Sequence, residues 1–175
     1  CGFAYQDSND ENFEQIFRCD MSTPFTHVHR HNLVRDAVAR ACRAYGLSVT
    51  SEPTCFTYDD GRRRRPDLII HTAPMKTVTD FSLVKSDANL QDEEKSKVDA
   101  HAAAVNKMGA IFIPFIMHTR GTFGTKAEEF IRTITKAIQP SLQQGFFREL
   151  RQTVASVTAQ GRALSILAAR DRYGW

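Results

Sequence analysis

The sequence predicts an α/β fold: a small mixed sheet between helices, in the order helix, three strands, helix, strand and helices. Two observations support this prediction. Apolar residues recur at helical spacing in four segments, and short β-rich runs bounded by turn residues lie between the first two of them. The longest apolar run, residues 110–117, falls far short of the ~18 residues that a membrane-spanning helix needs, and it suits a buried strand.

The first half of the chain provides one helix and three strands. Residues 1–29 are polar and irregular, and Asn32 is the expected N-cap of a helix that ends at Gly46. Strands are expected over residues 47–54, 65–72 and 77–84, the last two joined by a turn at Ala73-Pro74.

The second half provides a helix, a strand and further helices. The expected elements cover residues 89–108, 110–118, 125–138 and 142 onward. Thr125 and Glu128 form a predicted capping box, Pro140 ends that helix, and Gly161 marks a bend or break in the last one. We therefore divide the chain into an N-terminal segment (1–29), a core (30–139) and a C-terminal helical extension (140–175).

Composition narrows the classes of function. The formal net charge of +3 is mildly basic, and Arg62, Arg63, Arg64 and Arg65 form an unbroken basic run that permits a polyanionic partner. The four cysteines follow no disulfide-scaffold spacing, and no charged-then-apolar leader is present, so we expect reduced thiols and an intracellular protein. The first residue is not methionine, and we expect the chain to be part of a longer polypeptide.

The predicted hairpin brings two acidic residues together. If its turn is centred between Ala73 and Pro74, Asp67 and Asp80 lie opposite each other, with Cβ atoms ~4.5–5.5 Å apart. Like charges in that position need a compensating cation, and Mg²⁺ binds through one or two carboxylates while keeping waters. The alternative is that one aspartate only caps a turn or pairs with an arginine, and a one-residue slip would separate the two.

The following helix carries a candidate cation. Glu94, Lys97 and His101 share one face by their i+3 and i+4 spacing. An ammonium group there could hold an attacking hydroxide or stabilise a charged phosphorus centre. Lys95 is the competing residue, and an ordinary surface lysine is the alternative interpretation of Lys97.

These residues together resemble a PD-(D/E)-x-K nuclease core. More narrowly, they resemble the restriction-like endonuclease domain of site-specific non-LTR (LINE-type) retrotransposons, over roughly residues 30–138. In that family a helix lysine replaces the lysine two places after the second acid, and Ser82 stands at that place here. The motifs that carry the resemblance are Arg65-Pro66-Asp67, Asp80, Lys97, residues 111–115, Arg120-Gly121, Arg30-His31-Asn32 and Glu52-Pro53.

The resemblance implies a restriction-endonuclease-like core and a nuclear, divalent-metal-dependent DNA endonuclease. Asp67 and Asp80 would ligate Mg²⁺ or Mn²⁺, with Glu52 as a weaker third ligand, and Lys97 would orient the water. The domain would nick double-stranded target DNA, and the freed 3′-hydroxyl would prime reverse transcription. Its partners would be the element's RNA and an upstream reverse transcriptase domain of the same polypeptide. No membrane partner is expected, and the sequence leaves the oligomeric state open.

The resemblance also raises a zinc site, because these elements usually carry a Cys-Cys-His-Cys knuckle before the nuclease. The chain departs from that pattern. A Zn²⁺ site would have to use Cys1 and Cys19 with two of His27, His29 and His31. The alternative is that the histidines are polar loop residues and that His31 orders the first helix.

Several arginines are candidate DNA contacts. The basic run lies just before Asp67, where it could hold a phosphate, act as a nuclear-import signal or form a solvated turn. Arg120 precedes a glycine-rich turn into the helix at Thr125, which could hold a phosphate at the helix N-terminus or simply connect strand to helix. Arg30 opens the first helix and completes the set.

Two other classes of function remain open. In the first, the acids are structural and the basic loop anchors a non-catalytic nucleic-acid-binding module. In the second, the C-terminal helix forms an interaction or dimerisation domain. A cleavage assay in Mg²⁺ beside a binding assay in EDTA separates the module from the nuclease.

Overall fold

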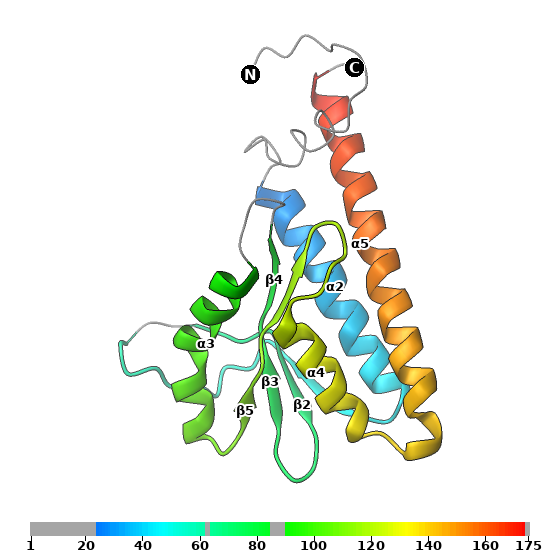
Figure 1. The fold of residues 1–175 in the computed structure, drawn as a ribbon. Coiled ribbons are helices and arrows are strands. Elements are labelled where there is room, and N and C mark those ends of the chain that lie inside the picture. Colours follow the sequence, from blue (N-terminus) through cyan, green and yellow to red (C-terminus); the bar gives the residue numbers. More distant parts are fainter. Residues whose placement is uncertain (1–23, 62–63, 85–89, 174–175) are drawn as a thin grey trace.

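The computed structural model describes residues 24–61, 64–84 and 90–173. Its order of helix, strands, helix, strands and helices confirms the predicted α/β class (Figure 1). No helix in these ranges is long and apolar enough to cross a membrane. The elements are α2 Pro24–Ala44, β1 Ser48–Ser51, β2 Leu68–His71, β3 Thr77–Thr79, β4 Phe81–Val84, α3 Leu90–Lys107, β5 Ile111–Phe112, β6 Phe115–His118, α4 Thr125–Lys136, the 3-10 helix Pro140–Leu142 and α5 Gln143–Tyr173.

The sheet is mixed, as predicted. Strands β1, β2, β3 and β5 lie in that order in a four-stranded sheet, and β4 pairs with β6. The β1–β2 and β2–β3 pairs are antiparallel, whereas β3–β5 and β4–β6 are parallel. The β2–β3 hairpin pairs Leu68 with Thr79 and Ile70 with Thr77, which is the register expected for a turn centred at Ala73-Pro74.

Two predicted strands are each divided in the structure. Residues 77–84 form β3 and β4 with a break at Asp80, and residues 110–118 form β5 and β6. The parallel pairing continues in one register across the break, because Ile113 and Phe115 donate their N–H groups to Val78 and Asp80, each at 2.9 Å. The Pro114 nitrogen between them therefore faces away from this ladder, where a proline costs no hydrogen bond.

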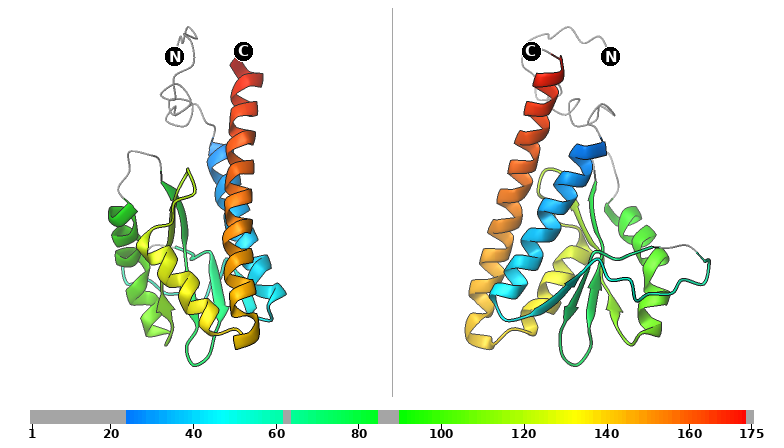
Figure 2. Two further views of the ribbon diagram at one scale, coloured as in Figure 1. Left: turned by 45° about the vertical axis from the view of Figure 1, so that its right-hand side comes forward. Right: turned by 180° about the vertical axis from the view of Figure 1, so that it is seen from behind.

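The two faces of the sheet contribute to different hydrophobic clusters. Leu68 and Ile70 belong to the main core with residues of α2, α4 and α5. Ile69 and Val78 point to the other face and pack with Val105 of α3. Figure 2 shows α3 on one side of the strands, and α2 and α5 side by side on the other.

Helix α2 begins earlier than the sequence analysis predicted. It begins at Pro24, so Asn32 is not its N-cap and the last residues of the expected irregular segment 1–29 are helical. Proline is well tolerated in the first turn, where its missing N–H has no intrahelical partner. Val28 in this part of α2 is exposed, so the helix extends beyond its apolar stripe.

The predicted capping box of α4 is wrong. The N-cap residue is Gly124 and no side chain of the first turn caps the helix. Glu94 of α3 does so instead, because its Oε1 accepts the backbone N–H of Lys126 at 2.7 Å. A Cβ at position 124 would collide with the Glu94 carboxylate, so this approach requires glycine.

Helix α5 has neither the bend nor the break predicted at Gly161. The helix runs without interruption from Gln143 to Tyr173. A Cβ at position 161 would lie 2.9 Å from Cγ of Arg30, so this glycine allows α2 and α5 to approach closely. Phe146, Leu150 and Val154 of α5 are fully buried in the main core.

Candidate active site

The acid pair lies at the centre of the candidate site. Asp67 directly precedes β2 and Asp80 directly follows β3, one residue beyond the last pair of the hairpin, Leu68 with Thr79. The Asp67 N–H donates to the Thr79 carbonyl at 3.1 Å, which keeps the two acids adjacent. Asp80 contacts Lys97 of α3, whereas Asp67 contacts His31 of α2. Asp67 is 8% and Asp80 7% exposed, and the two carboxyl groups are close enough for each to shift the pKa of the other.

Asp67 is held by donors from two elements. Its Oδ2 accepts the backbone N–H of Phe81 at 2.7 Å and the Nε2–H of His31, in α2, at 3.0 Å. Burial raises the pKa of Asp67, but the hydrogen bonds and the charge of His31 outweigh this and leave the pKa below its ordinary value. The hydrogen bond to Asp67 in turn raises the pKa of His31. Asp67 is therefore the carboxyl group of the pair that stays ionised.

Asp80 is the group of the pair that tends to keep a proton. Burial and the negative charge of Asp67 raise its pKa to about 6, against the opposing effect of Lys97. The Lys97 ammonium lies 2.7 Å from Oδ2 of Asp80. Burial lowers the pKa of Lys97, but the charge and hydrogen bond of Asp80, with the charges of Glu93 and Asp67, together outweigh burial and leave the pKa above its ordinary value. Lys97 is therefore a cation throughout the neutral range.

A tyrosine and a histidine lie beside Asp80. The Tyr58 hydroxyl is 2.6 Å from Nδ1 of His101, and Nε2 of His101 is 3.8 Å from Oδ2 of Asp80. Burial and the charges of Lys97 and Arg64 lower the pKa of His101 to about 4. Burial and the charge of Asp80 raise the pKa of Tyr58 to about 12. Both rings are therefore neutral at physiological pH.

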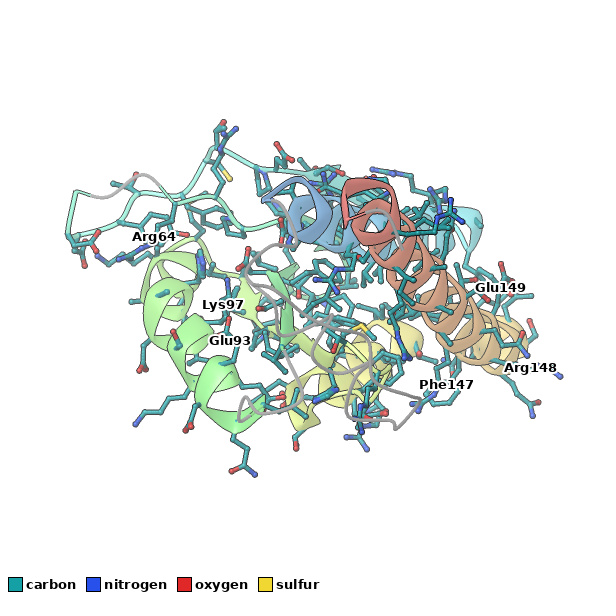
Figure 3. The ribbon with its side chains drawn as sticks, turned by 90° about the horizontal axis from the view of Figure 1, so that it is seen from above. Arg64, Glu93, Lys97, Phe147, Arg148 and Glu149 are labelled. Atoms are coloured by element: carbon teal, nitrogen blue, oxygen red, sulfur yellow. The ribbon has the colours of Figure 1, made fainter. Side chains whose placement is uncertain are left out.

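A cavity of about 700 Å³ is lined by Asp80, Lys97 and His101, but not by Asp67 or Tyr58. Its walls come from α2, α3, β4 and the loop before β2, and Figure 3 shows Lys97 and Glu93 on α3 with Arg64 on the loop beside it. The lining residues are Val28, Arg30, His31, Arg64, Arg65, Asp80, Phe81, Ser82, Leu83, Glu93, Ser96, Lys97, Ala100 and His101.

The structure distinguishes between the predicted acidic and lysine candidates. Lys97 contacts Asp80, whereas Lys95 is exposed. Glu52 does not line the cavity: its backbone has φ 47°, and its carboxylate accepts a hydrogen bond from Arg35 at 2.7 Å. The acidic residue that joins Asp80 in the lining is Glu93, which the sequence analysis missed.

The arginine candidates fall in different places. Arg64 and Arg65 line the cavity, but Arg64 is also tied to Asp60 at 2.5 Å and to the Ala100 carbonyl at 3.2 Å. Arg62 and Arg63 lie outside the described residues. Arg30 lines the cavity and is 7% exposed, as buried as Asp80, and its role as a DNA contact stays a prediction.

The phosphate site expected near Arg120 stays a prediction, and one contact in the structure speaks against it. Arg120 is exposed in the turn after β6 and does not line the cavity. The N-terminus of α4, where a phosphate was expected to bind, is already occupied by the carboxylate of Glu94. The glycine-rich segment is therefore a strand-to-helix connection.

The predicted zinc site cannot be assembled from the described residues. Cys1 and Cys19 lie outside them, and His27 and His29 belong to helix α2. Within the described ranges, no group of three or more His, Cys, Asp and Glu residues could hold a metal ion. Cys42 and Cys55, the cysteines in those ranges, are free thiols.

Comparisons with known proteins assign no family. No family profile matches the sequence, and no curated protein matches it. A crystal structure described as a protein of unknown function, AF1548, is similar with a TM-score of 0.39 and 12% sequence identity, covering 76% of this chain and 98% of that chain. A similarity this weak adds nothing about function.

Proposed function

We propose that this chain is a divalent-metal-dependent DNA endonuclease domain with a PD-(D/E)-x-K-type site. Following the resemblance in its motifs, we propose that it belongs to a nuclear non-LTR retrotransposon polyprotein and nicks double-stranded target DNA to prime reverse transcription. Its partners would be the element's RNA and an upstream reverse transcriptase domain. The observation that carries the proposal is the buried pair Asp67 and Asp80, in which Lys97 lies 2.7 Å from Asp80 and both Asp80 and Lys97 line an open cavity. Asp67 is not part of the lining.

The residues of the pair fit a hard divalent cation. Mg²⁺ binds through one or two carboxylates and keeps several waters, so it does not require the larger ligand cluster that the described residues lack. The pKa of Asp80, raised to about 6, means that the pair resists carrying two negative charges without a further cation. Asp67 and Asp80 would hold Mg²⁺ or Mn²⁺, which when bound would supply an activated water and stabilise charge on a phosphate.

The chain's own residues would do the remaining work. Lys97 stays protonated, so it would orient the attacking water or stabilise the developing phosphate charge; it could not abstract a proton. His31 and the N–H of Phe81 hold Oδ2 of Asp67, so this carboxylate is fixed in place before any ion binds. Arg65, exposed at the cavity wall, would contact the DNA backbone without reading sequence.

One observation favours the alternative, a non-catalytic nucleic-acid-binding module. Each acid already has a basic side chain beside it, His31 for Asp67 and Lys97 for Asp80, and structural ion-pair networks also have this arrangement. Such a module would bind DNA with strong salt dependence in EDTA and would not cleave it with any metal.

Nicking of supercoiled plasmid by the 175-residue chain in Mg²⁺ or Mn²⁺ tests the proposal. Asp80→Asn keeps the shape of the side chain but removes the charge, so we expect cleavage to fall below detection while circular dichroism shows the fold intact. Asp99→Asn, at an exposed position of α3, is the control for loss of one carboxylate and should cleave normally. Full cleavage by Asp80→Asn, or none by the wild type with purified target DNA, would reject the nuclease.

A further inference from the structure

Tyr58 and His101 form a buried pair that the metal-ion chemistry leaves without a role. Tyr58 lies in the loop between β1 and β2, and His101 lies on α3 one turn after Lys97. Their hydrogen bond is 2.6 Å long, and the residues are 8% and 5% exposed. The pair therefore fixes the loop that carries Arg64 and Arg65 against the helix that carries Lys97.

The contacts of His101 favour one of its two tautomers. The Tyr58 hydroxyl is protonated at neutral pH, and of the described residues only His101 is within hydrogen-bond distance of it, which favours donation from Tyr58 to Nδ1. A neutral imidazole with an accepting Nδ1 has its hydrogen on Nε2. The second contact agrees, because Nε2 faces the Asp80 carboxylate at 3.8 Å, where an N–H is attracted and a lone pair is repelled.

This N–H group has room for another partner. The distance of 3.8 Å to Asp80 is too long for a hydrogen bond, and the Lys97 ammonium already contacts the same oxygen at 2.7 Å. The described residues give Nε2 no acceptor, and His101 is part of the cavity lining. The cavity therefore contains a neutral donor next to a charged one, four residues apart on one helix.

We propose that His101 donates its Nε2–H to a phosphate oxygen of DNA bound in the cavity, and that Tyr58 is the positioning residue that fixes this tautomer. The inference rests on the proposed function and adds a substrate contact to it. A donor that is oriented before the substrate arrives stabilises phosphate charge without reorganisation.

A rival assignment makes the opposite predictions. If His101 were a metal ligand, Nε2 would offer its lone pair and Nδ1 would donate to the Tyr58 oxygen. Removing His101 would then weaken metal binding, whereas the loss of a phosphate donor would leave metal binding unchanged and slow cleavage.

Long-range ¹⁵N–¹H spectra of the 175-residue chain, labelled at histidine, test the tautomer without relying on activity. We expect the Nε2–H form of His101 in the wild type and a mixture of tautomers in Tyr58→Phe. Tyr45→Phe is the control. The Tyr45 hydroxyl donates to Glu149 at 2.8 Å and does not line the cavity, so its removal should leave the tautomer of His101 unchanged. An Nδ1–H form in the wild type would overturn the inference.

Single-turnover cleavage and calorimetry with Mn²⁺ test the contact itself. His101→Ala should lower the maximal rate about a hundredfold, the scale of one preorganised donor, with unchanged Mn²⁺ affinity. His101→Gln, whose amide can donate from a similar position, should recover most of the rate. If His101→Ala does not fold, Tyr58→Phe carries the test with a smaller loss of rate.

The outcomes separate the two proposals. If the wild type cleaves DNA and His101→Ala cleaves at the same rate, this inference alone is overturned. A weaker Mn²⁺ affinity in both His101 variants would also overturn it, because His101 would then be a metal ligand. A wild type that neither binds nor cleaves DNA would overturn the proposed function and this inference with it.

Discussion

At the scale of single residues, the two acids of the pair differ in how they respond to pH. The pKa of Asp80 is raised, so the folded protein binds its proton more tightly than the unfolded chain, and stability without metal falls as pH rises from about 4 to about 6. The pKa of Asp67 is lowered, so its contribution has the opposite sign and is lost as pH falls through its folded-state pKa. A cation bound between them would offset the first effect above about pH 6.

Lys97 and Lys95 allow a residue-level test of the proposed chemistry. Lys97→Gln removes the ammonium that contacts Asp80, so we expect the maximal cleavage rate to fall by about a hundredfold or more. Lys95→Gln removes the same charge from an exposed position and should cleave as the wild type does. Single-turnover rates with saturating DNA compare the two variants. Equal losses of rate would show that the positive charge of the helix matters and that the contact between Lys97 and Asp80 does not.

The sequence predicts part of the site at this scale. The turn at Ala73-Pro74 sets the hairpin register, so the opposition of Asp67 and Asp80 was predictable, and helical spacing selected the face of Lys97. His101 was visible on that same face, but no spacing rule joins it to Tyr58, 43 residues earlier. Glu52 stays an untested third ligand, and its contact with Arg35 at 2.7 Å is one that no spacing rule reveals.

At the scale of elements, the order of helices and strands was predictable, but the residues at which the helices begin were not. The residues around 125 satisfy the capping-box pattern, yet the cap of α4 comes from Glu94, 32 residues away in sequence. Such a cap depends on how α3 and α4 approach each other, and local sequence does not contain that information. The start of α2 at Pro24 was not predicted because its first turns are polar and extend past the core, so no apolar periodicity marks them.

The cap can be tested by unfolding in denaturant. Glu94→Ala removes the acceptor for the Lys126 N–H and should lower the free energy of unfolding by about 1 kcal/mol, the usual cost of a lost N-cap. Thr125→Ala changes an exposed residue that makes no cap and should have little effect. The reverse ranking would restore the capping box and contradict the structure.

At the scale of the whole molecule, α5 belongs to the main hydrophobic core. Leu150 is fully buried there together with residues of α2, although the two helices are far apart in sequence. In Figure 1 they run side by side along one side of the molecule. From the sequence, residues 140–175 are expected to form an extension, because helical periodicity reveals an apolar face but not the surface that this face covers.

The integration of α5 predicts one cooperative unfolding transition. Leu150→Ala leaves a cavity in the shared core, so we expect a loss of about 3 kcal/mol in a single transition. Leu164→Ala, at a position on the same helix that is 39% exposed, should cost far less. Calorimetric unfolding with two separate transitions would mean that α5 is independent of the rest.

The central claim is that Asp67 and Asp80 together hold one divalent cation, and calorimetric titration of the 175-residue chain with Mn²⁺ tests it most directly. We predict one site at pH 7.5 and a much weaker affinity at pH 5, because protons then compete for Asp80. Asp67→Asn and Asp80→Asn should each abolish the heat of binding, while Asp99→Asn retains it. Mn²⁺ binding that is unaltered in either pair variant, or no binding by the wild type, would contradict the account.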